Sequence, residues 1–164
     1  MKILDVYTDG SDKNKQRKGN NRLGIGGIAV ELKEDKIIDK FSSEILPKYM
    51  ELYYGTTNCS NPTMEMLALL HAIYKFKPIF KAYDKIVFHA DYIGVDNWVF
   101  SNKWKIKEPY IERIKQDIMN EIQEQNLKGK ISFSWVKGHQ KDTTIPDVKW
   151  NNCADLLAKG EYHE

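Results

Sequence analysis

The sequence has few cysteines, no long apolar run and little net charge, and each absence excludes a class of protein. Its two cysteines, Cys59 and Cys153, are far apart and outside any CxxC pair, which argues against a disulfide framework or a zinc site. No apolar run approaches the roughly 18 residues of a membrane span. Strand-like sequence begins directly at the N-terminus, so we expect no signal peptide. We therefore expect a cytoplasmic or otherwise intracellular protein with reduced thiols and no membrane partner.

The net charge of the chain is low, but its basic residues are unevenly distributed along the sequence. The net charge of +2 is too small to identify a nucleic-acid partner by itself. Residues 13–22 contain no acid, however, and residues 102–107 form a second basic cluster. A solvated loop is the simpler interpretation of 13–22, and substrate contact is the alternative. The chain has 164 residues and neither a repeat nor a linker, so we expect one domain over 1–164, and a monomer.

Hydrophobic periodicity and turn signals predict alternating strands and helices. Strands are expected at 3–9, 23–32, 36–45, 85–91 and 130–139, and helices at 61–76, 110–125 and 148–160, with a further short helix at 93–100. Asn61 is a suitable N-cap for the first helix, because Pro62 would then occupy its first helical position. Gly160 is expected to end the last helix.

The order of these elements predicts an α/β fold. A meander followed by β-α-β connections gives a five-stranded mixed sheet flanked by helices. Strands one to three should be antiparallel, and strands one, four and five should be parallel. Ligands of such sheets bind beyond the carboxyl ends of the parallel strands.

Four carboxylates stand outside the apolar pattern of their elements. Asp9 and Asp91 end the first and fourth predicted strands, Glu65 lies near the start of the first helix, and Asp155 lies inside the last helix. If the two strands are parallel neighbours, both aspartates reach the same sheet edge. Converging carboxylates without a basic partner repel one another strongly, and a divalent metal usually resolves this repulsion. Oxygen ligands select Mg²⁺ or Mn²⁺ over zinc.

Six short motifs share their order and spacing with a known family. They are YTDGS at 7–11, GIGGIAV at 24–30, TMEM at 63–66, HAD at 89–91, WVKGH at 135–139 and NNCADLLAKG at 151–160. On these motifs, which run the length of the chain, the sequence resembles type I ribonuclease H. The resemblance implies the ribonuclease H-like fold.

The resemblance also implies a set of catalytic residues and a reaction. By resemblance, Asp9, Glu65, Asp91 and Asp155 bind two Mg²⁺ ions, which Mn²⁺ can replace, and His139 takes the position of the family's histidine. Asp9 would bridge both ions, Glu65 and Asp91 would serve the leaving-group metal, and Asp155 would serve the metal of the attacking water. His139 would shuttle a proton or help to release product. The expected reaction is endonucleolytic hydrolysis of the RNA strand of an RNA/DNA hybrid, leaving 5′-phosphate and 3′-hydroxyl ends.

The hybrid is the expected partner, and its RNA strand is marked by the 2′-hydroxyl. By resemblance, Asn61 contacts this region and Trp98 lies along the DNA strand. Gly10 and Ser11 offer backbone N–H groups for similar contacts. The lysines at 103, 105 and 107 are close enough in sequence to meet phosphates. Trp98 and Trp104 suit substrate contact and core packing equally well.

Each residue also has an ordinary explanation. A DGS sequence is usually just a turn, and Glu65 near a helix start is explained by the helix dipole. Each ordinary explanation is adequate for one residue taken alone. Five such residues, however, would have to match the order and spacing of the family motifs by chance, so we prefer the functional interpretation. Two further hypotheses stay open. One is another nuclease on the same fold, such as an integrase, transposase or resolvase, although these generally place their glutamate elsewhere. The other is a hybrid-binding module with a silent site, although all four acids are present.

Overall fold

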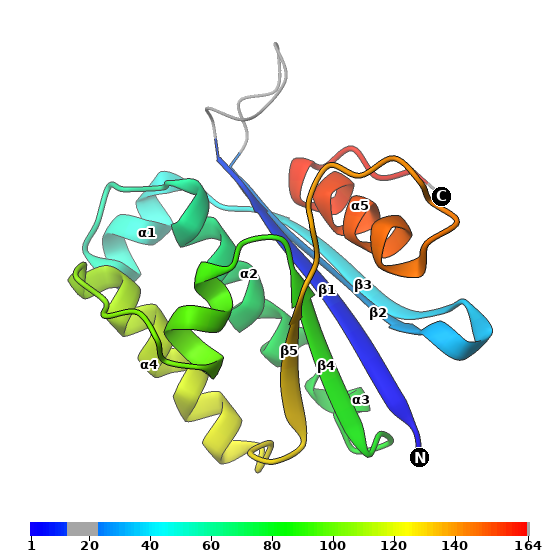
Figure 1. The fold of residues 1–164 in the computed structure, drawn as a ribbon. Coiled ribbons are helices and arrows are strands. Elements are labelled where there is room, and N and C mark those ends of the chain that lie inside the picture. The colour runs from blue at the N-terminus through cyan, green and yellow to red at the C-terminus, as the bar shows by residue number, and fades with distance from the viewer. Residues whose placement is uncertain (13–22, 164) are drawn as a thin grey trace.

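The computed structural model of the chain describes residues 1–12 and 23–163. Within these residues, five strands form one mixed sheet (Figure 1). They are β1 (Ile3–Ser11), β2 (Gly24–Glu31), β3 (Lys36–Glu44), β4 (Lys85–Ala90) and β5 (Ile131–Trp135). The spatial order is β3-β2-β1-β4-β5, with antiparallel pairs among β1, β2 and β3 and parallel pairs among β1, β4 and β5. The predicted sheet is confirmed.

Helices cover both faces of this sheet. They are α1 (Pro47–Tyr54), α2 (Asn61–Lys75), α3 (Lys77–Phe80), α4 (Pro109–Glu124) and α5 (Pro146–Lys159), with short helical turns η1 (Leu32–Glu34) and η2 (Asp96–Phe100). In Figure 1, α5 lies on one face, and α1, α2 and α4 lie on the other. Because β1 is the central strand and is covered from both sides, all of its residues after Ile3 are buried.

Two hydrophobic clusters hold the layers together. The larger lies on the α2 side and includes Leu4, Val6, Leu69 and Ile114. The smaller lies under α5 and consists of seven buried residues: Tyr7, Ile28, Val30, Val136, Trp150, Ala154 and Leu157. Burying apolar surface is the main favourable term in folding, so both clusters fix the helices relative to the central strand.

Several element boundaries differ from the predicted ones. The N-cap of α2 is Ser60 and not Asn61, which is the first helical residue. The fifth strand stops at Trp135, and α5 begins two residues earlier than expected, at Pro146. Gly160 ends α5 in the left-handed conformation, as predicted, with φ 72°. The short helix expected at 93–100 is the π-helical turn η2.

Two α-helices were not predicted, and one predicted segment cannot be compared. Helix α1 lies where no element was expected, and α3 extends the helical region after α2. The basic segment 13–22 lies outside the described residues. None of the helices in the described part of the chain combines the length and the apolar character that a bilayer crossing requires.

Candidate active site

Four acidic side chains meet at one end of the sheet, as the sequence predicted. Asp9 lies near the end of β1, and Asp91 directly follows the neighbouring parallel strand β4. Glu65 lies one turn into α2, on one face of the sheet, and Asp155 comes from α5 on the other. Strands and helices that are distant in the sequence therefore supply one group of carboxylates.

The carboxylates are close enough to share a cation. One oxygen from each of Asp9, Glu65 and Asp91 lies within 4.8 Å of the others. Asp155 lies within hydrogen-bonding reach of Asp9 and completes the group. On its other side, Asp155 Oδ2 is 3.0 Å from the Nζ of Lys159, one turn further along α5. Lys159 thus compensates one of the four negative charges.

Asp9 lies in a buried position among the other acids. Its side chain is buried, and burial raises the pKa of its carboxyl group well above the ordinary value. The negative charges of Glu65 and Asp91 and a hydrogen bond with Asp155 raise the same pKa further. A carboxylate in this place needs a proton or a cation to neutralise it. An all-oxygen donor set around a buried aspartate fits Mg²⁺ or Mn²⁺.

Gly10 brings α2 close enough for Glu65 to take part. The backbone N–H of Gly10 donates a hydrogen bond to Glu65 Oε1, with a distance of 3.0 Å between nitrogen and oxygen. A Cβ atom at position 10 would lie only 2.3 Å from the carbonyl carbon of Met64. The glycine of the DGS motif is therefore required by the packing of α2 on β1.

Asp91 is held by the last residue of β5 and by the segment that follows this strand. Trp135 donates its Nε1–H to the backbone carbonyl of Asp91 over 2.9 Å. Gly138 packs closely against the Asp91 side chain: a Cβ atom added at position 138 would lie only 2.8 Å from Asp91 Oδ2. The next residue, His139, is exposed and has a positive φ of 56°, which is uncommon for a residue other than glycine.

The acids open into a cleft of about 530 Å³. Eight of the predicted site residues line it: Asp9, Gly10, Ser11, Asn61, Glu65, Asp91, His139 and Asp155. Three lining residues were not predicted as part of the site, namely Tyr92, Gly138 and Lys159. Lys159 carried a signal in the sequence, because it lies four residues after Asp155 in a predicted helix and faces the same side.

Trp98 does not line the cleft but is connected to it by aromatic contacts. Its ring lies 5.7 Å from that of Tyr92, which does line the cleft, and 6.0 Å from that of Trp104. Trp98 packs against the larger hydrophobic cluster, whereas Trp104 is 43% exposed. Trp98 therefore serves core packing, and its contact with substrate stays a prediction.

The family comparison agrees with this geometry. The family model for RNase H matches residues 1–163 of the chain. The chain belongs to the ribonuclease H family. Its relatives include the ribonuclease H of Haemophilus influenzae strain 86-028NP, which is 26% identical over 164 residues, covering 97% of this chain and 89% of that protein. Membership identifies a type I ribonuclease H, an enzyme of the hydrolase class.

Solved structures of ribonuclease H proteins share the fold. The RNase H1 of the halophilic archaeon Halobacterium salinarum NRC-1 matches with a TM-score of 0.65 at 19% identity, over 97% of this chain and 96% of that one. LC11-RNase H1 in complex with an RNA/DNA hybrid matches with a TM-score of 0.68 at 18% identity, over 96% and 94%. At these identities the likeness concerns the fold, and the roles of individual residues must be argued from the site.

Proposed function

We propose that this ribonuclease H cuts the RNA strand of RNA/DNA hybrids endonucleolytically, with divalent metal ions held by Asp9, Glu65, Asp91 and Asp155. The observation that carries the proposal is the convergence of these acids around a buried aspartate in an open cleft. Their repulsion makes the site costly without a cation, and their oxygen atoms suit Mg²⁺, with Mn²⁺ as a substitute.

The positions of the four acids support a site for two ions. Two bound Mg²⁺ ions would supply an activated water and stabilise the leaving 3′-oxygen, giving 5′-phosphate and 3′-hydroxyl products. Asp9 lies on the buried central strand, with Glu65 and Asp91 near it and Asp155 within hydrogen-bonding reach, so it is the residue that would contribute to both ions. Glu65 and Asp91 then form one half of the site, and Asp155 forms the other.

His139 is suited to move a proton at the rim of the cleft. Its ring is exposed and lies beyond the acids, in the segment that packs against Asp91. An imidazole in this place can accept or donate a proton as product leaves, without holding a metal. This role predicts that His139→Ala slows turnover without abolishing it.

The hybrid fits the cleft as a substrate class. Ser11 and Asn61 line the wall that the RNA strand would follow, where the 2′-hydroxyl is the group that marks RNA. The expected contact of the Gly10 N–H with RNA is not available, because this N–H already donates to Glu65 Oε1. The occurrence of a hybrid in the LC11-RNase H1 structure supports this choice. The DNA strand would pass along the aromatic contacts that lead from Tyr92 to Trp98 and Trp104.

A panel of substrates tests the proposal. End-labelled RNA/DNA hybrid, duplex RNA and duplex DNA are incubated with the protein in Mg²⁺, in Mn²⁺ and in EDTA. We expect cleavage of the RNA strand of the hybrid only, with no cleavage in EDTA or by Asp9→Asn. Metal-dependent cleavage of duplex DNA would instead indicate a different nuclease on this fold. Tight hybrid binding without cleavage would indicate a silent binding module.

A further inference from the structure

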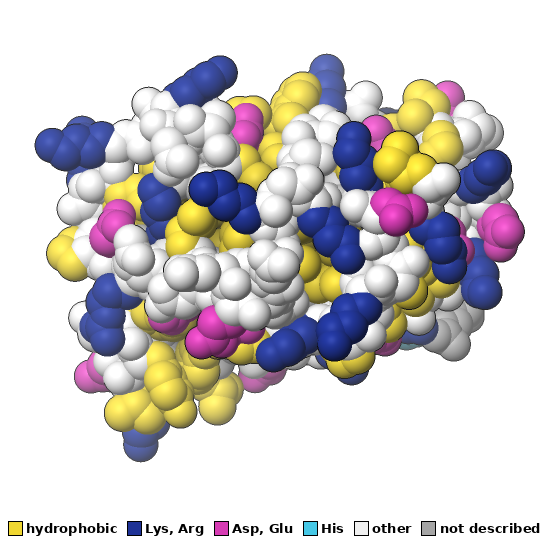
Figure 2. Space-filling view, turned by 90° about the horizontal axis from the view of Figure 1, so that it is seen from below, with side chains coloured by type: hydrophobic (Ala, Val, Ile, Leu, Met, Phe, Trp, Pro, Cys, Tyr) yellow, Lys and Arg dark blue, Asp and Glu magenta, His cyan; other side chains and the backbone are white. Residues whose placement is uncertain are grey.

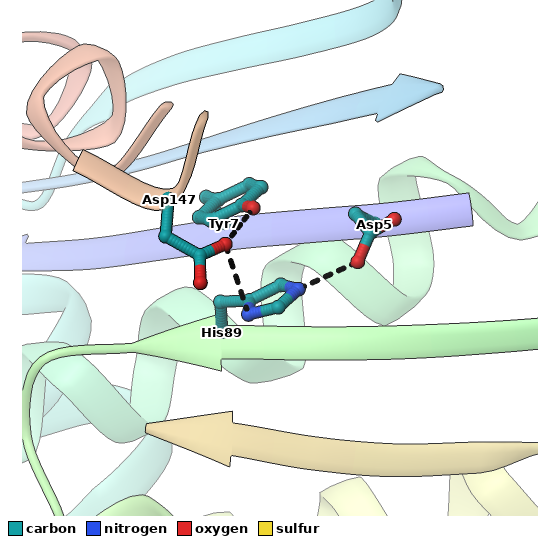
Figure 3. Close-up of polar contacts among 4 residues, drawn as sticks. All are labelled: Asp5, Tyr7, His89 and Asp147. Carbon is teal, nitrogen blue, oxygen red and sulfur yellow. Dashed lines mark hydrogen bonds and ion pairs between the residues drawn. The ribbon is translucent and has the colours of Figure 1, made fainter. Parts of the chain in front are cut away.

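A second group of polar residues lies on β1, on β4 and at the start of α5 (Figure 3). The Tyr7 hydroxyl donates a hydrogen bond to Asp147 Oδ1, and His89 Nδ1 lies 3.9 Å from the same oxygen. The other ring nitrogen of His89, Nε2, lies 2.7 Å from Asp5 Oδ1. The Tyr7 and His89 rings stack with centroids 4.2 Å apart and planes only 8° from parallel. The four residues form one connected cluster.

The cluster is fixed to the same strands as the metal-site acids. Tyr7 and His89 are register partners on β1 and β4, and each lies two residues before an acid, Asp9 or Asp91. Side chains two residues apart on a strand point to the same face, here the face that α5 covers. Tyr7 and His89 are buried, so the sheet half of the cluster is held rigidly.

Asp147 supplies the other half and lies in the first turn of α5. A first-turn acid also has an ordinary explanation, because a carboxylate there stabilises the helix dipole. That explanation requires no partner across the sheet, whereas Asp147 accepts a hydrogen bond from a tyrosine of the central strand. Its side chain is 46% exposed, so it contributes little to the core by burial.

The segment between β5 and α5 depends on anchors at its two ends. Near β5, the backbone N–H of Val136 donates to the Ala90 carbonyl over 3.1 Å, and Gly138 packs against Asp91. Further along, Asn152 donates its Nδ2–H to the Gln140 carbonyl over 3.0 Å. Residues 141–145 are all exposed, and Asp147 is the next contact with the sheet.

The backbone of His139 shows why such anchors matter. Its φ of 56° lies in the left-handed region, which is unfavourable for residues other than glycine. Conformations of this kind persist only where the surrounding structure fixes the chain on both sides. Gly138 and its contact with Asp91 fix one side, and the Gln140 and Asp147 contacts fix the other.

We propose that Asp147 is a positioning residue for His139: its contact with Tyr7 and His89 anchors the end of segment 136–146 to the sheet and so holds His139 at the rim of the cleft. The catalytic consequence rests on the proposed function. Helix α5 and its Asp155 should not depend on this anchor, because buried Trp150 and Leu157 already fix the helix to the sheet. The effect of removing the Asp147 carboxylate should therefore be confined to the segment that carries His139.

Hydrogen–deuterium exchange tests the structural part without an activity assay. Asp147→Ala and Tyr7→Phe should each speed exchange of the hydrogen-bonded amides in 137–145, those of Thr144 and Ile145, by about tenfold, while those in 150–158 stay unchanged. Glu112→Ala is the matched control, because it removes an exposed first-turn acid from α4, away from the site. Unchanged exchange in 137–145, or equal loosening of all of α5, would overturn the proposal.

A double-mutant cycle tests the catalytic part. Asp147→Ala should lower kcat for hybrid cleavage about fivefold at a nearly unchanged KM, since a small displacement of a catalytic group reduces turnover. In a His139→Ala background, the same change should lower kcat less than about twofold, because the residue that it positions is already absent. The same factor in both backgrounds would show that Asp147 does not act through His139. A wild-type protein that fails to cleave would refute the proposed function, and the exchange experiment would still decide the anchor.

Discussion

Asp9 is placed where an unneutralised carboxylate is costly, on a buried strand facing other acids. Burial and the neighbouring Glu65 and Asp91 raise the pKa of its carboxyl group well above the ordinary value. Natural sites accept such a loss of stability when the group is needed for function. The effect of the Asp9 carboxylate on the free energy of unfolding can therefore be measured separately from its effect on catalysis.

Replacing Asp9 by Asn should stabilise the metal-free protein while abolishing cleavage. Because the folded-state pKa is raised, the contribution of Asp9 to stability is greatest below its unfolded-state pKa of about 3.9 and is lost as pH rises through the folded-state pKa. In EDTA, wild-type protein should thus lose more unfolding free energy than Asp9→Asn between about pH 4 and pH 8. At the upper end, the variant should be more stable by about 0.5–2 kcal/mol.

Urea denaturation in EDTA at several pH values provides the measurement. Glu112→Gln is the control, because this exposed side chain lies outside the acidic group. The explanation would be wrong if Asp9→Asn were less stable than the wild type at high pH, or if the two proteins had the same pH dependence.

A residue of the site could be predicted from the sequence when it was an acid in or next to an otherwise apolar strand or helix. Asp9 and Asp91 were found because each follows an apolar strand, and Glu65 because it lies in an apolar helix. Asp147 has no such signal, since an acid in the first turn of a helix is ordinary. Its partners Tyr7 and His89 meet it only after β1, β4 and α5 are assembled. No sequence spacing contains that information.

At the scale of elements, the close approach of α2 to β1 determines whether Glu65 reaches the other acids. Gly10 permits this approach and also donates the backbone hydrogen bond that orients Glu65. A methyl group at this position would collide with the backbone of Met64, which a rigid helix cannot easily move away.

Gly10→Ala should therefore destabilise the protein by about 2–4 kcal/mol and reduce cleavage strongly. Gly129→Ala is the matched control, because a Cβ there would meet nothing within 4 Å and only its positive φ of 84° is unfavourable. That control should lose only about 1–2 kcal/mol and retain activity. Denaturation and hybrid cleavage assays on both variants check the prediction. Equal losses in the two variants would refute the packing argument.

Elements with clear periodicity were predicted, and those without it were missed. The apolar residues of α4 recur at helical spacing, so its position was found to within one residue. Helix α1 exposes Leu52 and Tyr53 on its surface, and so lacks the clean apolar stripe by which a helix is recognised. The fifth strand was predicted too long, because alternation continues in the sequence beyond Trp135 whereas the strand ends there and Gly138 packs against Asp91.

At the scale of the whole molecule, the cleft lies at one end of the strands of the sheet, and a different surface lies at the other end. The acids lie at the carboxyl ends of β1 and β4, whereas α3 and the N-terminus lie at the other end (Figure 1). Figure 2 looks onto this other end, where lysine and arginine side chains are spread among acidic and apolar ones. The exposed lysines at 103, 105 and 107 lie instead in the segment that contains Trp104, next to the aromatic contacts of the cleft.

Replacing Lys105 and Lys107 together by alanine should weaken hybrid binding and reduce its salt dependence. The slope of log Kd against log salt should fall by about 1 for each phosphate that the variant no longer binds. Fluorescence anisotropy in an Asp9→Asn background, which prevents cleavage, measures both quantities. The matched pair Lys77→Ala and Lys81→Ala, on exposed positions at α3, should leave the slope unchanged. An equal change in both pairs would mean that binding does not follow the cleft side of the molecule.

The most direct test of the central claim is a time course of hybrid cleavage before and after metal is returned. Protein is freed of metal with EDTA, mixed with a hybrid whose RNA strand is end-labelled, and then supplied with excess Mg²⁺. We predict an intact RNA strand before the addition, internal cuts with 5′-phosphate and 3′-hydroxyl ends after it, and an uncut DNA strand throughout. Cleavage that continues in EDTA, or a folded protein that leaves the RNA intact with Mg²⁺ present, would contradict the claim.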